Sequence, residues 1–374
     1  MPTFCRHNRF VERCPICSRT LPEHASSAPR PARKRPSRSP GAAAGARTRE
    51  RPRQQGVRIR RELRAEDDGY RSELVPGLRA SADAERLARE IAFSSERLLA
   101  LAAAPFGLYA TIRAAAEDDL ERATWACFLT VYLSPLGSEA EDVAEGEGEG
   151  AGGGEDPFAG IRRALAAGPE HGAPVLAGAT GEPSGLPDLD GVPLGPRTSH
   201  DPARGNETLI AYRQWVERGG TAAASHPAAN PAAGATQAVA FTGDPAWSPQ
   251  RRFARLFERL ALPGFGRMGR YELLVTLGRL GLYELRPDSL HLGAARGLSA
   301  DDPTDLAAKR VFAIADPLLL ERRAAALAAA CAVPVEALDL ALANWASPQR
   351  ATLGFRPHGG DDGALARAED ALGL

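Results

Sequence analysis

The sequence lacks the features of a membrane or secreted protein. It contains no run of about 18 apolar residues, which a membrane-spanning helix would need, and its N-terminus has no apolar stretch typical of a signal peptide. It has only five cysteines, and two of them, Cys127 and Cys331, stand alone in apolar contexts where a free buried thiol is the ordinary case. We therefore expect a cytoplasmic protein without a membrane partner.

Aromatic residues are also scarce, at 6% of the chain, so we expect a helical core built mainly from leucine and alanine. Charge of one sign is not in excess, because 46 Lys and Arg face 47 Asp and Glu. Glycine (38) and proline (30) are abundant, which predicts long unstructured stretches beside a globular part. The length of 374 residues allows one large domain or two average ones.

The charge is distributed unevenly along the chain. Residues 1–64 carry 17 Lys or Arg and 4 Asp or Glu, a net charge of +13. Residues 25–64 are rich in Pro, Arg and Ser without apolar periodicity, which predicts a disordered basic linker able to lie along a polyanion; a solubilising spacer is the alternative. Residues 137–156 hold eight acidic residues and no basic one, and residues 219–240 are of low complexity. We expect disordered insertions near both.

Apolar residues recur at helical spacing along much of the chain after residue 80. The pattern predicts helices at residues 81–104, 117–133, 156–166, 206–218, 249–260, 269–281, 304–315, 316–331 and 334–345. No convincing apolar–polar alternation predicts a strand. The expected fold class is therefore all-α, with one helical domain at residues 65–347 and a loose C-terminal tail at residues 348–374.

The N-terminus carries a candidate metal site. Four ligands lie within 13 residues, and the last two have the Cys-x2-Cys spacing that lets two thiolates reach one ion. The four are Cys5, His7, Cys14 and Cys17. Because a segment this short cannot bury a hydrophobic core, residues 1–24 would fold only around the metal. We predict a small module with one structural Zn²⁺; the alternative is an N-terminus with reactive thiols.

A second candidate site lies between two predicted helices, at Leu262, Pro263, Gly264, Phe265 and Gly266. The two glycines permit a sharp turn that exposes backbone amides at the start of the next helix, where the helix dipole is positive. A DNA phosphate can dock on such amides without reading the base sequence. We expect Arg267 and Arg270 to add positive charge beside this turn.

The turn resembles the hairpin of the helix-hairpin-helix DNA glycosylase superfamily, whose members follow it with a helix and then a catalytic Asp in the pattern Asp-x4-Arg-Val. Residues 305–311, Asp-Leu-Ala-Ala-Lys-Arg-Val, match that pattern. The resemblance implies an all-α glycosylase-like domain over roughly residues 90–345 and a catalytic role for Asp305. Asp301 and Asp302 precede it closely and compete for the same match.

The sequence departs from that superfamily in two places. Lyase members carry a Lys after the hairpin where this chain has Met268, so no Schiff-base nucleophile is available there and β-lyase chemistry is not expected. Residues 286–303 also lengthen the spacing between the hairpin and Asp305.

Three motifs resemble a narrower group, the alpha-glutamyl/putrescinyl thymine pyrophosphorylases of the actinobacterial type (clade 3). They are the cysteine-rich start, residues 124–135 (Thr-Trp-Ala-Cys-Phe-Leu-Thr-Val-Tyr-Leu-Ser-Pro) and residues 195–200 (Gly-Pro-Arg-Thr-Ser-His). This glycosylase-like branch is implicated in thymine hypermodification. The resemblance implies an enzyme that acts on a pyrophosphorylated 5-hydroxymethyluracil in DNA and replaces pyrophosphate by an amine. Its partners would be DNA and an amine or amino-acid co-substrate, and it would associate with the nucleoid.

Either kind of enzyme needs a base turned out of the duplex and a pocket to receive it. The Asp305 carboxylate would stabilise positive charge or accept a proton, although N-capping of its helix would alone explain an Asp at that position. His200 is a candidate general acid, with loop capping by Ser199, His200 or Asp201 as the alternative.

Two sets of side chains are candidates for substrate binding. Pyrophosphate departure requires positive charge, for which the candidates are Arg197, Arg204 and Arg310. Aromatic side chains would stack on the base, and the candidates are Trp125, Tyr132, Tyr212 and Trp215. For the aromatic residues, packing in a helical core is the favoured alternative.

Three functions remain open on this evidence. The first is a DNA base-modifying transferase or pyrophosphorylase, the second a monofunctional DNA glycosylase, and the third a non-catalytic DNA-binding module that grips with the hairpin and the zinc unit. A site that joins Asp305 with convergent arginines favours the first. A site filled by side chains favours the third.

Overall fold

The computed structural model describes residues 65–134, 175–176, 183–184, 194–224, 236–293, 302–355 and 362–374. The predicted zinc ligands Cys5, His7, Cys14 and Cys17 lie outside the described residues, and so does the basic linker at 25–64. The same holds for the acidic insertion at 137–156, for the helix predicted at 156–166 and for Asp301.

The described part of the chain is helical, which confirms the all-α prediction at that level. The helices are α1 (Ser81–Ala103), α2 (Gly107–Asp118), α3 (Leu120–Leu133), α7 (Glu207–Ala224), α8 (Gln237–Thr242), α9 (Pro249–Arg259), α10 (Arg267–Arg279), α11 (Pro303–Phe312), α12 (Pro317–Ala330), α13 (Ala337–Ala346) and α14 (Asp362–Leu372), with a 3-10 helix η3 (Pro202–Arg204). A two-residue antiparallel pair, β1 (Val175–Leu176) and β2 (Pro183–Ser184), was not predicted.

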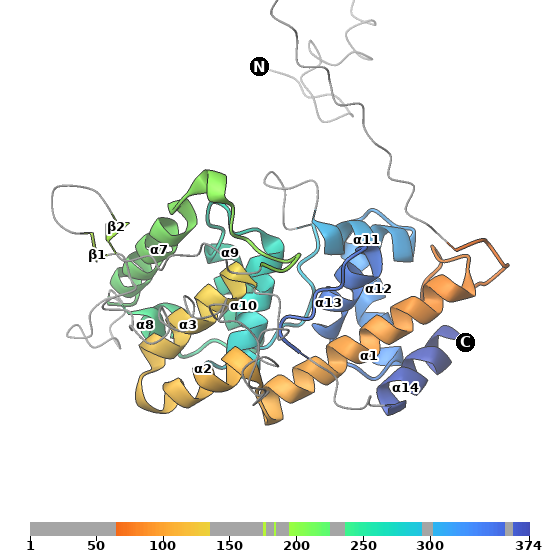
Figure 1. The fold of residues 1–374 in the computed structure, drawn as a ribbon, viewed down its shortest axis with the longest axis horizontal. Coiled ribbons are helices and arrows are strands. Elements are labelled where there is room, and N and C mark those ends of the chain that lie inside the picture. Colours follow the sequence, from red (N-terminus) through yellow and green to blue (C-terminus); the bar gives the residue numbers. More distant parts are fainter. Residues whose placement is uncertain are drawn as a thin grey trace, which may run out of the picture. The chain divides into compact units, whose positions relative to one another are not determined.

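The helices share one continuous hydrophobic core. Helix α10 packs against α3, α9 and α1, while α1 also packs against α13 and α14, and α11 packs against α12 and α13 (Figure 1). The predicted turn lies between α9 and α10, and Asp305 lies on α11. Helices α1 and α13 connect the two, because α10 packs on α1, α1 on α13 and α13 on α11.

Helix α3 is buried on every side, as its apolar sequence indicates. The Asp119 carboxylate caps its N-terminus by accepting a hydrogen bond from the Arg122 amide, and the helix ends where Ser134 adopts a left-handed conformation, with φ of 45°. Every residue from Ala123 to Leu133 is buried. A helix without a polar face can only lie inside the domain.

The structure corrects three sequence predictions. Helix α2 was not predicted, and helix α8 and the end of α7 fall within the segment 219–240 that was expected to be an insertion. The tail 348–374 was expected to be loose, yet it contains α14, which packs on α1 with Ala368 and Leu372 buried. Helices α8 and α14 bury few side chains, among them Ala240, Ala364 and Ala368, and such small side chains give a weak apolar periodicity.

One described stretch, Ser81–Asp118, is long and apolar enough to cross a membrane by composition. In the structure it is two helices, α1 and α2, separated by residues 104–106. One face of α1 is buried against other helices of the domain and includes Arg97, which is 1% exposed. Of the most apolar 18-residue window in this stretch, 22% is buried inside the structure.

Candidate functional site

The predicted turn between α9 and α10 is present and tightly held. The Phe265 amide donates to the Leu262 carbonyl over 3.1 Å, and both side chains are buried. Gly264 has a φ of +72°, a conformation that favours glycine, and a β-carbon there would lie 2.4 Å from Thr208 Oγ1. The Thr208 hydroxyl donates to the Pro263 carbonyl over 2.7 Å. Leu262 and Phe265 therefore anchor the turn, which presents its backbone and the exposed Pro263 ring to a ligand.

The start of α10 offers backbone donors next to open space. Gly266 is the N-cap residue, no side chain caps this helix end, and nothing lies within 4 Å of where a β-carbon on Gly266 would stand. The first amides of an α-helix have no partner within the helix. This geometry suits an anion that approaches the backbone closely, as the sequence predicts.

Arg267 and Arg270 do not supply the expected surface charge beside the turn, because both are buried, at 3% and 6% exposure. The Arg270 guanidinium donates to the Phe257 and Gly266 carbonyls over 2.9 and 3.3 Å, so it ties the end of α9 to the start of α10. Burial is the main cause that lowers the pKa of Arg270, and Arg267 adds to the effect. Both arginines therefore hold the turn in place from inside.

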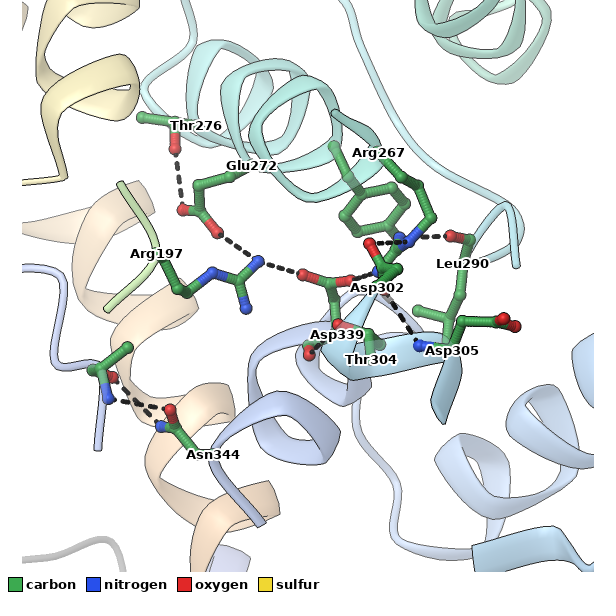
Figure 2. Close-up of polar contacts among 12 residues, drawn as sticks. Arg197, Arg267, Glu272, Thr276, Leu290, Asp302, Thr304, Asp305, Asp339 and Asn344 are labelled. Atoms are coloured by element: carbon green, nitrogen blue, oxygen red, sulfur yellow. Dashed lines mark hydrogen bonds and ion pairs between the residues drawn. The ribbon is translucent and has the colours of Figure 1, made fainter. Parts of the chain in front are cut away.

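A buried network of alternating charges runs from α1 to α11, and Figure 2 shows its part from Glu272 to Asp302. It links Arg97, Glu272, Arg197, Asp339, Arg267 and Asp302 in that order. The Arg197 Nη2 to Asp339 Oδ2 distance is 2.5 Å, and Arg267 Nε lies 3.1 Å from Asp302 Oδ2. Three cations face three anions, so these six buried residues carry no net charge. Removal of one member would leave a buried charge unpaired, which costs about 3–5 kcal/mol.

Asp339 is the centre of this network. Burial opposes its charged form, but the guanidinium groups of Arg267 and Arg197 outweigh burial and hold the pKa of Asp339 below its usual value. The same carboxylate raises the pKa of Arg267 against the opposing effect of burial, with Asp302 as the next contributor. Asp339 therefore stays ionised and holds α10 and the loop around Arg197 to α13.

At the start of α11, the two candidate carboxylates Asp302 and Asp305 have different roles. Asp302, not Asp305, is the N-cap: its Oδ1 accepts from the Asp305 amide over 3.0 Å, and Pro303 occupies the first helical position. The alternative in which Asp305 caps the helix is therefore wrong. Asp305 Oδ2 pairs with Lys309 Nζ at 2.6 Å, whereas its buried Oδ1 has no hydrogen-bond partner among the described residues. Asp305 thus keeps one acceptor oxygen that is buried and has no hydrogen bond within the described part of the chain.

The loop that carries Arg197 and His200 lies along the end of α3. The Gly195 amide donates to Ser134 and the Ser199 amide to Tyr132, over 2.7 and 2.8 Å. Arg197 is 5% exposed, and its Nε and Nη1 have no partner in the described part of the chain. His200 Nδ1 lies 3.2 Å from the Tyr132 hydroxyl. The loop places both predicted residues beside buried partners.

Loop capping falls to Asp201, which accepts from the Ala203 amide at the start of η3. Arg204 is exposed and pairs with Asp201 and Glu207 at 3.5 and 3.3 Å. Arg310, another phosphate candidate, is exposed on α11. Of the three candidate arginines, the structure brings only Arg197 into the buried charge network.

The candidate base-stacking residues lie in the hydrophobic core. Four aromatic side chains are at most 4% exposed: Trp125, Tyr132, Tyr212 and Trp215. Phe128 stacks on Tyr212 with ring centroids 3.7 Å apart. This arrangement is the core packing that the sequence favoured for them.

Sequence reasoning missed Arg97, Glu272 and Asp339. Glu272 and Asp339 are charged residues next to apolar ones in a helix, as in Tyr-Glu-Leu-Leu and Leu-Asp-Leu-Ala, whereas Arg97 follows Ser-Ser-Glu and carries no such signal. A charged residue on an otherwise buried helix needs a partner, and this was the signal that could have found the two carboxylates. The pairing itself joins residues far apart in the sequence, so only the fold reveals it.

The turn, the Asp302 cap and Asp339 all fall in one stretch of sequence that a known family shares. Residues 202–355 match the model of the alpha-glutamyl/putrescinyl thymine pyrophosphorylase clade 3 family. The match confirms the resemblance that the motifs indicated. The range matched to the pyrophosphorylase family covers the turn and α11, while Arg97 and Arg197 precede it. Comparisons with curated proteins and with solved structures gave no match.

Proposed function

We propose that this protein modifies a thymine-derived base in DNA, as the name of the matching family indicates, with a glycosylase-like helix-hairpin-helix domain. The observation that carries the proposal is the match of residues 202–355, which contain both the backbone turn and Asp305. The substrate would be a pyrophosphorylated 5-hydroxymethyluracil turned out of the duplex, and the co-substrate an amine or amino acid.

The DNA backbone would bind at the start of α10. The uncapped amides and the open space at Gly266 suit a phosphate oxygen, and no side chain there reads a base. Leu262 and Phe265 would support this contact only from within, because both are buried. Binding at such a site is insensitive to sequence, which fits an enzyme that recognises a modified base.

Asp305 would accept a proton in the reaction. In amine transfer, the amine nitrogen attacks the methylene carbon, the carbon–oxygen bond to pyrophosphate breaks, and the nitrogen loses a proton. Asp305 Oδ1 is the acceptor that has no protein partner in the described residues, while Lys309 holds the other oxygen. Asp302 is less suited, because both of its oxygens are used, by the Asp305 amide and by Arg267.

Arg197 would act on the leaving pyrophosphate. It keeps two nitrogens without a protein partner among the described residues, and guanidinium groups bind phosphate oxygens in pairs. His200, in the same loop, would protonate the departing group. Trp125 and Tyr132 lie in the core and are not part of this proposal as base-stacking groups.

Monofunctional glycosylase activity is the second candidate; Met268 disfavours only a bifunctional lyase and does not separate this candidate from amine transfer. This residue stands in α10 where lyase members of the superfamily carry a Lys. In that reaction Asp305 would activate water or stabilise charge at the sugar, and the base would leave intact. A non-catalytic DNA-binding module is the third candidate.

Mass spectrometry of nucleosides separates the three functions. The protein is incubated with DNA that contains pyrophosphorylated 5-hydroxymethyluracil and with an amine such as putrescine or glutamate. We expect an amine-modified thymine and free pyrophosphate. A free base with an abasic site would instead establish a glycosylase, and unchanged DNA that is nevertheless bound would favour the non-catalytic module.

A further inference from the structure

Arg267 reaches three separate segments from its place directly after the turn. Its Nη1 donates to the Leu290 carbonyl over 2.8 Å, and its Nη2 pairs with Asp339 on α13. Its Nε lies 3.1 Å from Asp302 Oδ2 at the start of α11, in an ion pair without the geometry of a hydrogen bond. The side chain is 1% exposed. The planar guanidinium thus hydrogen-bonds Leu290 and Asp339 in fixed directions while its charge faces Asp302, an arrangement that a lysine ammonium cannot reproduce.

Asp302 extends this connection to Asp305. One oxygen of its carboxylate faces Arg267, and the other accepts the Asp305 amide over 3.0 Å. Figure 2 shows the Asp305 amide directed at Asp302 and the Asp305 carboxylate directed away from the charge network. The path from the turn to the Asp305 backbone thus consists of two polar contacts, of which the Arg267–Asp302 pair is buried and the Asp302–Asp305 hydrogen bond is partly buried.

We infer that Arg267 and Asp302 are positioning residues that hold Asp305 at a fixed place relative to the turn. The inference rests on the proposed function, because it takes Asp305 as the working carboxylate. DNA that is gripped at Gly266 brings its extruded base to a defined distance from the turn. A carboxylate displaced by about 1 Å loses roughly 10²-fold in rate, so a rigid link between turn and carboxylate serves catalysis directly.

The chain contains a matched control for Asp302. Asp316 caps α12 in the same way, with Pro317 at the first helical position and a hydrogen bond of 3.0 Å from the Leu319 amide. Asp316 is exposed, whereas Asp302 is buried against Arg267. Asparagine caps a helix about as well as aspartate does. The changes Asp302→Asn and Asp316→Asn therefore keep both caps and differ in the loss of the Arg267 ion pair.

The experiment compares these two variants with the wild type and with Arg267→Lys. Turnover and KM are measured on DNA that contains pyrophosphorylated 5-hydroxymethyluracil, and amide hydrogen exchange is measured at residues 303–312 in the free protein. We expect Asp302→Asn and Arg267→Lys to lower kcat by roughly 10- to 10²-fold at unchanged KM, and to speed exchange in the first turn of α11. Asp316→Asn should change neither quantity.

Three results would overturn the inference. One is wild-type turnover in Asp302→Asn, even with faster exchange, because the contact would then be merely structural. Another is a raised KM at unchanged kcat, because Arg267 and Asp302 would then serve DNA binding. The third is exchange in α11 no faster than in Asp316→Asn. A wild-type protein that is inactive on this DNA counts against the proposed function instead, and the exchange comparison then tests only whether Arg267 and Asp302 hold the start of α11.

Discussion

At the scale of single residues, the two oxygens of Asp305 lie in different surroundings. Lys309 pairs with one, and the other has no partner among the described residues. We predict that Asp305→Asn lowers turnover by roughly 10²- to 10⁴-fold. The free energy of unfolding should change by less than about 1 kcal/mol, because Lys309 is 37% exposed and Asp302 provides the cap. Product formation and melting temperature measure the two effects.

Asp305→Ala tests the capping assignment separately. Since Asp302 caps α11, alanine at position 305 should also leave the melting temperature nearly unchanged, without the loss of about 1 kcal/mol expected for a removed cap. Full activity in Asp305→Asn would end the catalytic assignment. Asp301, outside the described residues, would then be the next candidate.

His291 gives the molecule an acid sensitivity. Burial, mainly, lowers its pKa from 6.5 to about 4; Arg267 and Arg270 act in the same direction, and Asp288 and Glu258 oppose them. Its ring stacks on Phe257 with centroids 4.4 Å apart. Between these two pKa values the unfolded chain binds a proton that the folded protein does not. The buried neutral His291 therefore does not reduce the free energy of unfolding above pH 6.5. That free energy falls as the pH drops from 6.5 towards 4, because the unfolded chain gains the proton first.

We predict that the melting temperature of the wild type falls more steeply between pH 6.5 and 4 than that of His291→Asn. Asparagine has no charge to gain in this range and tolerates the positive φ of 53° at this position. Thermal melts of both proteins across the range measure the difference. Equal slopes would show that the folded protein accepts a proton on His291 as readily as the unfolded chain.

At the scale of elements, the turn between α9 and α10 contains two glycines with different duties. Gly266 has a φ of −69° and open space around it, so Gly266→Val should fold normally but obstruct close approach of a phosphate to the α10 amides. Gly264 has a φ of +72° and a crowded β-carbon position, so Gly264→Ala should lower the melting temperature.

Fluorescence anisotropy with duplex DNA and thermal melts measure the two outcomes. We expect weaker DNA binding at an unchanged melting temperature for Gly266→Val. The exposed change Ala103→Val, at the end of α1, serves as a control for added apolar surface. Wild-type affinity in Gly266→Val would remove the start of α10 from the DNA-binding site.

At the scale of the whole molecule, charge is concentrated in residues 1–64, with a net charge of +13. We propose that this segment contributes non-specific contacts with DNA phosphates. Its deletion should weaken binding and flatten the dependence of affinity on salt, because fewer counterions are released. Titrations at several salt concentrations measure the slope. An unchanged slope would show that the basic segment does not contact DNA.

The N-terminal cysteines and histidine lead to a separate prediction. We propose that Cys5, His7, Cys14 and Cys17 bind one structural Zn²⁺. Elemental analysis of the purified protein should find about one zinc per chain, and a variant with Cys14→Ser and Cys17→Ser should lose it. Zinc content that survives both changes would exclude this ligand set.

The sequence by itself determined the local features of this protein. The apolar pattern of α3, the Ser248 and Pro249 start of α9 and the glycines of the turn act over a few residues, and most helices of the described part were predicted from them. The resemblance to the pyrophosphorylase group also rested on short motifs, and residues 202–355 match that family. The alanine-rich helices α8 and α14 were not predicted, because their weak apolar pattern does not identify a buried face.

The tertiary structure decided which charged residues meet. Sequence reasoning assigned Arg267 to the surface, yet the fold places it between Asp339 and Asp302, 72 residues away in one case. The fold also makes Asp302 the N-cap of α11, and it leaves one buried oxygen of Asp305 without a hydrogen-bond partner among the described residues. The physical reason is that a buried charge needs an opposite charge close in space. Which residue becomes that partner depends on which helices pack together, and this is determined by side-chain packing across the whole domain.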